Sequence, residues 1–203
     1  MSEASARKLE KRARIVNAAV DIFAEKGFRT ARVADIARLA GVADGTIYLY
    51  FKSKEEILIS IFEEKMDLLL TGLRLTLSEA TDSSDKINRF AKFHLGQVAA
   101  NPAVAEVLQV ELRLSHKFLR EYRPEKLWEY LGIFEDIVRQ GQKAGVFRQD
   151  IDPFVSSWSF FGGMDEIAMQ WVLSKKSQRI DLDSAAHQIA TIFTRGLSPQ
   201  PKQ

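Results

Sequence analysis

The chain of 203 residues contains no cysteine, and this absence excludes two kinds of structure. Neither a disulfide framework nor a zinc site built on thiolates can form without cysteine side chains. The chain also lacks an apolar run close to the ~20 residues that a bilayer-spanning helix needs. Its first dozen residues are charged and lack the apolar segment of a secretory signal peptide. We therefore expect a cytoplasmic protein that does not enter the membrane.

Residue patterns typical of enzymes and metal sites are also scarce. The three histidines, His94, His116 and His187, lie far apart in the sequence and form no HExxH pair. No glycine-rich phosphate loop is present either. A Ser/His/Asp site would fit the composition, but no motif positions one. We therefore expect no catalytic residues, no metal and no cofactor. An enzyme is the main alternative class of protein to the non-enzymatic function that we expect.

The formal net charge of +2 hides an uneven distribution along the chain. Residues 1–52 contain ten Lys/Arg and six Asp/Glu, a net charge of +4. Residues 53–203 contain nineteen Lys/Arg and twenty-one Asp/Glu, a net charge of −2. A basic N-terminal part joined to a slightly acidic remainder is typical of a DNA-binding domain fused to a domain with another task. The predicted domains are residues 1–52 and residues 53–203.

Residues 33–51 have the pattern of a helix-turn-helix. The first helix has an inner face of small and apolar residues, Ile36, Ala37 and Ala40. Gly41 can end this helix in the left-handed conformation, and Asp44 is the expected cap of the next helix. That second helix continues the apolar face through Ile47, Tyr50 and Phe51. Such a helix can enter the major groove of DNA.

The remaining chain shows helical periodicity and no alternation typical of strands. The predicted fold class is all-α: an N-terminal three-helix DNA-binding domain with the helix-turn-helix, followed by a larger helical domain for ligand binding and dimerisation. Residues 1–14 are expected to fray into a first helix that ends at Gly27. Ser53 and Glu56 form a capping-box pattern. Further helices are predicted over residues 54–79, 86–100, 125–144 and 182–197, and after Asn101-Pro102 and Asp152-Pro153.

Residues 13–62 resemble the DNA-binding domain of the TetR family of bacterial transcriptional regulators. The resemblance rests on Ile36-Ala37, Ala40-Gly41-Val42, Gly45-Thr46-Ile47-Tyr48, Tyr50-Phe51 and Lys54-Glu55. It implies a regulator that is not an enzyme. The family usually has Thr or Ser before the first helix of the motif, where this chain has Ala31-Arg32. It usually has Ser where this chain has Ala43, so individual phosphate contacts are expected to differ.

A narrower resemblance is to the TetR-type repressors of fatty-acid degradation. It is carried by the run GVADGTIYLYFKSKEEILISIFEEKM, by Gln109-Val-Glu-Leu-Arg113 and by Phe161-Gly-Gly-Met-Asp165-Glu166. This resemblance implies release from the operator by long-chain acyl-coenzyme A, a regulatory ligand and not a cofactor. The alternative within the family is a repressor of an efflux pump that responds to another small hydrophobic effector. A plain acyl carrier would leave the basic N-terminal part unexplained.

The residues expected to contact DNA lie on the outer side of the second helix of the motif and beside it. Thr46 and Tyr48 can reach base edges or phosphates through their hydroxyl groups, and Gly45 allows close approach of the backbone. Aromatic residues at helical spacing more often pack in a core, and exposed basic residues are often only solvated. The predicted set is Arg32, Asp44, Gly45, Thr46, Tyr48, Tyr50, Lys52 and Lys54.

Two further sets are predicted in the larger domain. A homodimer on palindromic double-stranded operator DNA is expected because one such motif reads few bases. Its interface would use the last two helices, with Phe154, Trp158, Gly162, Phe193 and Leu197. Candidates for the effector pocket are Phe93, Leu95, Leu108, Glu111, Leu112, Arg113, Phe134, Phe161 and Met164. Core packing is the alternative for each apolar candidate, and Glu111 could instead pair with Arg113.

Overall fold

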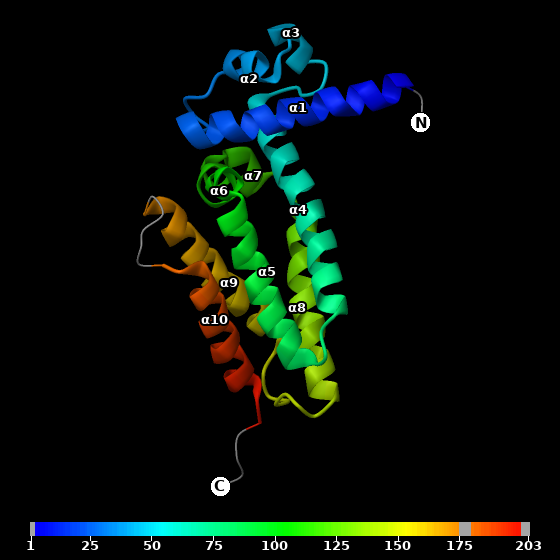
Figure 1. Cartoon of the computed structure of the whole chain (residues 1–203), viewed down its shortest axis with the longest axis vertical. Helices are drawn as coiled ribbons and strands as arrows, with labels where there is room; N and C mark the ends of the chain where they lie inside the picture. Colours follow the sequence, from blue (N-terminus) through cyan, green and yellow to red (C-terminus); the bar gives the residue numbers. More distant parts are fainter. Residues whose placement is uncertain (1–2, 175–179, 200–203) are drawn as a thin grey trace. The chain divides into compact units, whose positions relative to one another are not determined.

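The computed structural model describes residues 3–174 and 180–199, and every regular element in these ranges is helical (Figure 1). The predicted all-α class is confirmed. The chain forms two compact units. Unit 1 consists of Met1–Lys65 and Ala103–Arg123, and unit 2 consists of Met66–Pro102 and Pro124–Gln203. The predicted division at residue 52 stays a prediction, but the segment 103–123 clearly folds with the N-terminal helices.

Unit 1 is built around the long first helix. Its elements are α1 (Glu3–Lys26), α2 (Val33–Ala40), α3 (Asp44–Ile47), the first part of α4 (Lys54–Ser78), most of α6 (Pro102–Glu106), and α7 (His116–Arg120). The predicted fraying is wrong for residues 3–14, because α1 is helical from Glu3, and residues 1–2 lie outside the described residues. As predicted, Gly27 follows this helix with a positive φ of 75°. The inner face of α1 is fully buried at Ile15, Val16 and Phe23.

The segment after Pro102 is a broken helix. After α6 the chain makes a π-helical turn, η1 (Val107–Glu111), and then a 3₁₀ turn, η2 (Leu112–Leu114). Ser115 then caps α7, because its hydroxyl accepts the N–H of Phe118. A π-helical turn holds one more residue than an α-helical turn and is often found where a side chain must be redirected. Here it accompanies the burial of two polar residues, Gln109 and Glu111.

The described part of unit 2 contains the remainder of α4 and four further helices, α5 (Ser83–Ala100), α8 (Glu125–Lys143), α9 (Pro153–Leu173) and α10 (Leu182–Leu197). Side chains fix three of their starts: Asp82 caps α5, Asp152 caps α9 and Asp181 caps α10. The predicted cap and proline at Asp152-Pro153 are confirmed, and α10 has the predicted bounds. In the described residues no helix is both long and apolar enough to cross a bilayer.

Aromatic rings from four helices form the centre of unit 2. Phe134 on α8 stacks on Phe160 of α9, with ring centroids 4.0 Å apart. Phe90 of α5 meets both rings edge-on, and Phe193 of α10 contacts the same pair. Tyr130 continues this cluster beside Phe90. Because the rings contact one another across helices, the packing of α5, α8, α9 and α10 is mutually dependent.

Candidate functional site

The helix-turn-helix is present in unit 1 at the predicted position. Gly41 ends α2 in the left-handed conformation, with φ 66° and ψ 41°. The N–H of Val42 then donates to the carbonyl of Ala37, which closes the turn. The inner residues Ile36, Ala37, Ala40 and Ile47 are all buried, as the apolar pattern predicts. The outer faces of α2 and α3 are therefore the ones left for a partner.

Neither helix of the motif begins with a side-chain cap. Arg32 is the N-cap of α2 and Ala43 is the N-cap of α3, and neither makes a capping hydrogen bond through its side chain. The prediction that Asp44 caps the second helix is wrong. Asp44 is the first residue of α3, one position too late for its carboxylate to act as the N-cap. The first turns of both helices thus lack the acceptor that a Ser, Thr or Asp would supply.

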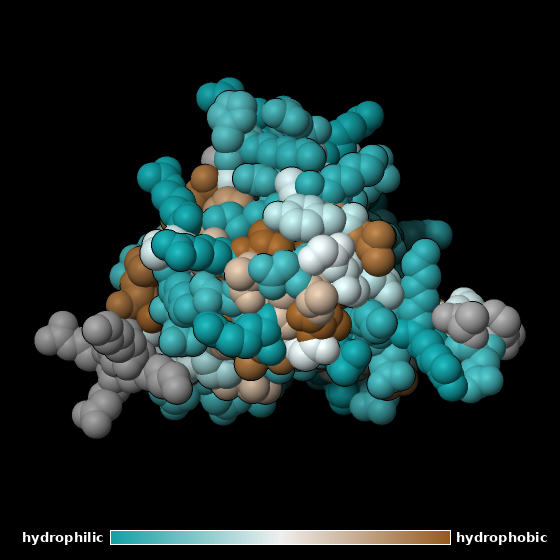
Figure 2. Space-filling model, turned by 90° about the horizontal axis from the view of Figure 1, so that it is seen from above, coloured by the Kyte–Doolittle hydropathy of each residue, from teal (hydrophilic) through white to brown (hydrophobic). Residues whose placement is uncertain are grey.

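The outer side of α3 and the turn after it carry most of the predicted DNA contacts. Tyr48 and Leu49 are 58% and 78% exposed, whereas Phe51 is only 2% exposed and belongs to the core. The exposed residues of the predicted set include Arg32, Asp44, Gly45 and Lys52, and Thr46 and Tyr50 are half-buried. Figure 2, seen from above the orientation of Figure 1, shows a largely hydrophilic face with small hydrophobic patches.

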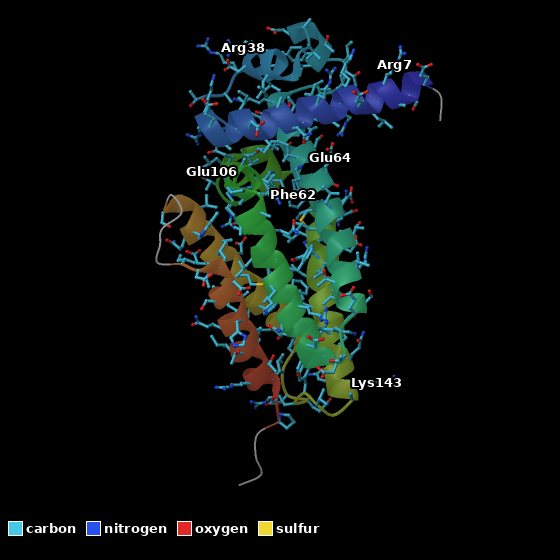
Figure 3. The ribbon with its side chains drawn as sticks, viewed as in Figure 1. Arg7, Arg38, Phe62, Glu64, Glu106 and Lys143 are labelled. Atoms are coloured by element: carbon cyan, nitrogen blue, oxygen red, sulfur yellow. The ribbon has the colours of Figure 1, made fainter. Side chains whose placement is uncertain are left out.

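Asp35 holds α2 onto the end of α1. Its carboxylate lies 3.1 Å from Lys26 Nζ and 2.8 Å from Arg38 Nη2. The hydrogen bond from Lys26 is the main reason that the pKa of Asp35 lies below its ordinary value, with the charges of Lys26 and Arg38 acting in the same direction. Arg38 is the exposed member of the group and points outward from α2 (Figure 3). Thus the angle between α1 and α2 is held by charge as well as by packing.

Lys54, a predicted phosphate contact, lies against the loop between α1 and α2. Its ammonium group donates to the carbonyls of Phe28, Arg29 and Ala31, the last two at 3.2 and 2.9 Å. The same group lies 4.7 Å from the centroid of the Phe28 ring. All three N–H protons thus have carbonyl partners within the protein. A contact with a DNA phosphate would have to replace one of them.

Glu111, a predicted ligand contact, lies at the same loop. It is 8% exposed, and its carboxylate accepts the backbone N–H of Phe28 at 2.6 Å. Gly27 lies against the same carboxylate: a Cβ on Gly27 would be 3.6 Å from Glu111 Oε1. The pKa of the nearby Glu106 is raised, mainly by burial and secondarily by the charge of Glu111. We call Phe28, with Lys54 on its carbonyl and Glu111 on its N–H, the Phe28 junction.

The nine predicted ligand residues divide between the two units. Leu108, Glu111, Leu112 and Arg113 belong to unit 1, and the other five belong to unit 2. Leu95, Phe134 and Met164 are buried in the core of unit 2, which is the alternative that the sequence left open. Phe93 and Phe161 are half-buried. Each unit therefore holds a subset of the predicted pocket residues.

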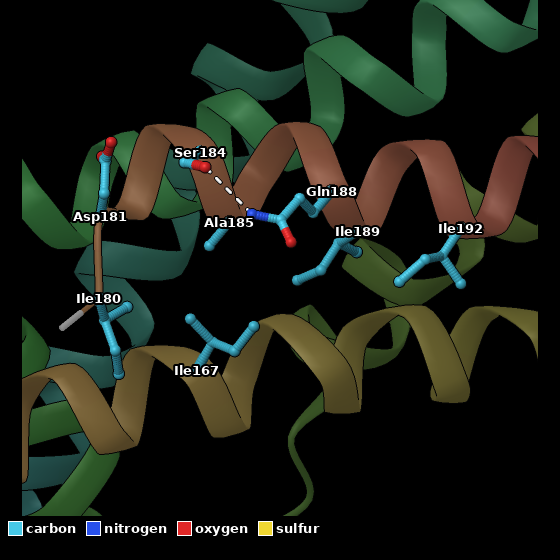
Figure 4. Close-up of a pocket in the computed structure, with 8 residues that line it drawn as sticks. All are labelled: Ile167, Ile180, Asp181, Ser184, Ala185, Gln188, Ile189 and Ile192. Carbon is cyan, nitrogen blue, oxygen red and sulfur yellow. Dashed lines mark hydrogen bonds between the residues drawn. The ribbon is translucent and has the colours of Figure 1, made fainter.

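The predicted dimer residues lie along α9 and α10. Phe154 and Trp158 are exposed and their rings are in contact, and Gly162 is exposed on the same helix. Phe193 and Leu197 line a groove of ≈470 Å³ together with Val155, Ser159 and Ile192. A second hollow of ≈350 Å³ continues between the two helices, with Ile167, Ile189 and Ile192 in its lining (Figure 4). This face is hollowed and mainly apolar, with polar side chains such as Ser184 and Gln188 also in its lining.

The geometry defines a class of protein: a helix-turn-helix with an exposed aromatic and basic outer side, attached to a larger helical unit, is typical of DNA-binding regulators. Comparison with protein families agrees. The model for bacterial regulatory proteins of the tetR family matches residues 15–61, and the model for the C-terminal region of YsiA-like proteins matches residues 62–196. The chain belongs to the tetR family of bacterial transcriptional regulators.

Individual relatives match along almost the whole chain. The fatty acid metabolism regulator protein of Bacillus subtilis is 35% identical over 190 residues, which cover 94% of this chain and 97% of the relative. The structure of the fatty acid degradation regulator FadR from Bacillus halodurans is 38% identical, with a TM-score of 0.85 and coverage of 92% and 96%. FadR from Bacillus subtilis in complex with stearoyl-CoA is 35% identical, with a TM-score of 0.84 and coverage of 91% and 98%.

Sequence reasoning missed three residues that the structure makes prominent: Phe28, His94 and Tyr130. His94 and Tyr130 form a buried hydrogen-bonded pair in unit 2. No spacing pattern signals such a pair, because the two residues lie on different helices. The one available signal for the Phe28 junction is the carboxylate of Glu111 in the largely apolar run VLQVEL, since a buried charge requires a partner.

The contacts of Lys54 predict a structural effect of its loss. We expect Lys54→Met, which keeps most of the apolar stem, to lower the free energy of unfolding by about 1–3 kcal/mol, because three carbonyls lose their donor. Lys52→Met, at an exposed neighbour, should change stability by less than about 0.5 kcal/mol. Urea unfolding of both variants measures the difference. Equal stability of the two variants, with operator binding weakened in both, would instead assign Lys54 to DNA.

Proposed function

We propose that this protein is a homodimeric repressor of fatty-acid degradation genes, released from its operator by long-chain acyl-CoA. The observation that carries the proposal is the match, over nearly the full chain, to fatty-acid regulators, one of them solved with stearoyl-CoA. Both the DNA-binding end and the region beyond it take part in that match. We further infer that the protein acts in the cytoplasm and catalyses no reaction.

DNA reading is assigned to the outer side of α3. Tyr48, at its C-terminal end, offers both a hydroxyl and a ring face, and Thr46 offers a hydroxyl and a methyl group. Arg32 and Lys52 are exposed beside the motif and supply positive charge for phosphates. The start of α2 has no side-chain cap, so its backbone N–H groups can donate hydrogen bonds to a phosphate oxygen. These contacts are assigned to one half of a palindromic double-stranded operator.

The partner on the other half-site is a second copy of this chain, bound through α9 and α10. Phe154, Val155 and Trp158 are exposed on α9, and Ile192 is 66% exposed on α10. An apolar face of this kind, next to a groove, is typical of a surface that is covered in the working protein. Because a two-fold interface uses the same face on both copies, α9 and α10 of each chain would form a four-helix contact.

The effector is assigned to the larger helical region because aromatic and aliphatic side chains dominate its centre. An acyl chain that enters the aromatic centre of unit 2 would displace rings such as Phe134 and Phe160, which are stacked in this structure. Ligand binding and a change of helix packing are therefore coupled. The effector releases DNA only to the extent that it binds the changed packing more tightly.

The Phe28 junction offers a route by which this change reaches the DNA-binding helices. The segment 103–123 lies within the region matched to YsiA-like C-terminal regions, yet its Glu111 holds the backbone at the end of α1. A shift of η1 would remove the acceptor from Phe28 N–H and would free the loop that leads into α2. The operator-binding arrangement of α2 and α3 would then lose one of its supports.

The central prediction concerns release from DNA. An operator selected from random duplexes with the purified protein should dissociate when stearoyl-CoA is added, and shorter acyl-CoA esters should be less effective because they bury less apolar surface. Coenzyme A alone is the control. Fluorescence anisotropy of labelled operator measures the release. Release by unrelated hydrophobic compounds, with indifference to acyl chain length, would favour the efflux-pump alternative, and no release at saturation would contradict an acyl-CoA effector.

A second prediction tests the role of Glu111. Glu111→Leu should weaken operator binding in the absence of ligand by about tenfold, because Phe28 N–H loses its acceptor and the α1–α2 loop loosens. Glu111→Gln retains an acceptor oxygen and should keep most of the affinity. Anisotropy with the same operator, and calorimetry with stearoyl-CoA, separate the two possible roles. If Glu111→Leu left operator binding unchanged and weakened the binding of stearoyl-CoA, Glu111 would be a ligand contact and not a support of the α1–α2 loop.

A third prediction tests the dimer. Trp158→Arg places a charge on the proposed interface and should raise the dimer dissociation constant at least about tenfold, with a matching loss of operator affinity. Leu75→Arg is the control, because Leu75 is equally apolar and 68% exposed but lies on α4. Sedimentation velocity over a range of concentrations measures both variants. A dimer as stable in Trp158→Arg as in the control would place the interface elsewhere.

A further inference from the structure

One polar pair lies inside the aromatic centre of unit 2. His94 of α5 is 8% exposed, and its Nδ1 lies 2.8 Å from the hydroxyl oxygen of Tyr130 on α8. Phe161 of α9 meets the imidazole edge-on, with ring centroids 6.0 Å apart, and also contacts Tyr130. The other ring nitrogen, Nε2, is buried and has no hydrogen-bond partner among the described residues. Three helices thus contribute rings around a polar atom that no described residue satisfies.

The hydrogen-bond count assigns the proton to Nε2. If the Tyr130 hydroxyl donates to Nδ1, both of these groups are satisfied, and Nε2–H is the one group without a partner. If Nδ1–H donated instead, the Tyr130 hydroxyl proton and the Nε2 lone pair would both lack partners. Burial lowers the pKa of His94 to about 4, with the charge of Asp165 acting in the opposite direction, so the ring is neutral at neutral pH. Nε2–H is therefore a neutral donor that needs an acceptor.

An unpaired buried N–H is costly, and native proteins rarely keep one without an acceptor from solvent or ligand. The rings around His94 suit an apolar chain, and a neutral donor among them suits a neutral acceptor such as a carbonyl oxygen. Phe161, whose ring contacts both members of the pair, is itself only half-buried, so one of the rings packed on the pair reaches the surface of unit 2.

We propose that His94 Nε2–H donates a hydrogen bond to the carbonyl oxygen of the bound acyl thioester, with Tyr130 fixing the imidazole tautomer. This inference rests on the proposed acyl-CoA effector and names the group that recognises its thioester. His94 distinguishes an acyl chain joined through a carbonyl from an alkyl chain of equal length. Tyr130 is a positioning residue, because it acts through His94.

Two ligands that differ only in the carbonyl test this assignment. Stearoyl-CoA has a thioester, and S-octadecyl-CoA has the same chain joined by a thioether, without the carbonyl oxygen. Calorimetry should show the thioester binding the wild-type protein about tenfold more tightly, the size of one well-formed hydrogen bond. His94→Phe should bring the ratio of the two dissociation constants close to one. His187→Phe, at an exposed histidine of α10, should leave the ratio unchanged.

Conservative variants separate recognition from folding. His94→Gln keeps an N–H donor near the position of Nε2 and should retain part of the preference, whereas Tyr130→Phe should reduce it without removing a ring. In the wild type, infrared spectra of stearoyl-CoA labelled with ¹³C at the carbonyl should show the carbonyl band at lower frequency on binding. A ratio near one in the wild type, or a ratio unchanged in His94→Phe, would overturn the assignment while the effector itself stands. Absence of binding by both ligands would overturn the effector as well.

Discussion

The structure of the DNA-binding unit depends on one residue, Phe28, through both of its backbone polar groups. Its N–H is accepted by Glu111 from the π-helical turn, and its carbonyl is bound by Lys54 from the start of α4. Its ring packs edge-on against Phe23 and lies beneath the Lys54 ammonium group. The loop that leads from α1 to α2 is thus held by two opposite charges, each placed where the backbone dipole favours it. The orientation of the helix-turn-helix follows from this loop.

This junction also explains why the segment 103–123 folds with the N-terminal helices. A carboxylate that is 8% exposed is tolerated only when a donor satisfies it, and the donor is a backbone N–H eighty-three residues earlier in the chain. The π-helical turn at η1 is the local irregularity that accompanies this contact. A region that the family comparison assigns to the C-terminal part therefore supplies a support of the DNA-binding part, which is the arrangement that a ligand-controlled regulator requires.

Two places where local rules are broken coincide with places to which function is assigned. Both helices of the helix-turn-helix begin without a side-chain cap, although α5, α9 and α10 each have one. The aromatic centre of unit 2 contains His94, whose Nε2 has no hydrogen-bond partner among the residues that the structure describes. Folding alone gains nothing from these features, since a cap and a satisfied core would both be more stable. A DNA phosphate would accept hydrogen bonds from the uncapped helix starts, and a ligand carbonyl would accept one from His94 Nε2.

The sequence by itself determined most of the helices, several of their ends and the helix-turn-helix. Gly27, Gly41 and Asp152-Pro153 act within one or two turns of their own positions, so their effects can be read without knowing the fold. Only the tertiary structure decided the rest: the break of the helix after Pro102, the absence of a cap at Asp44, and the contacts of Lys54 and Glu111 with Phe28. Those contacts join residues twenty-six and eighty-three positions apart. Helical periodicity predicts which face of a helix is buried. Which neighbouring element packs against that face depends on the tertiary structure.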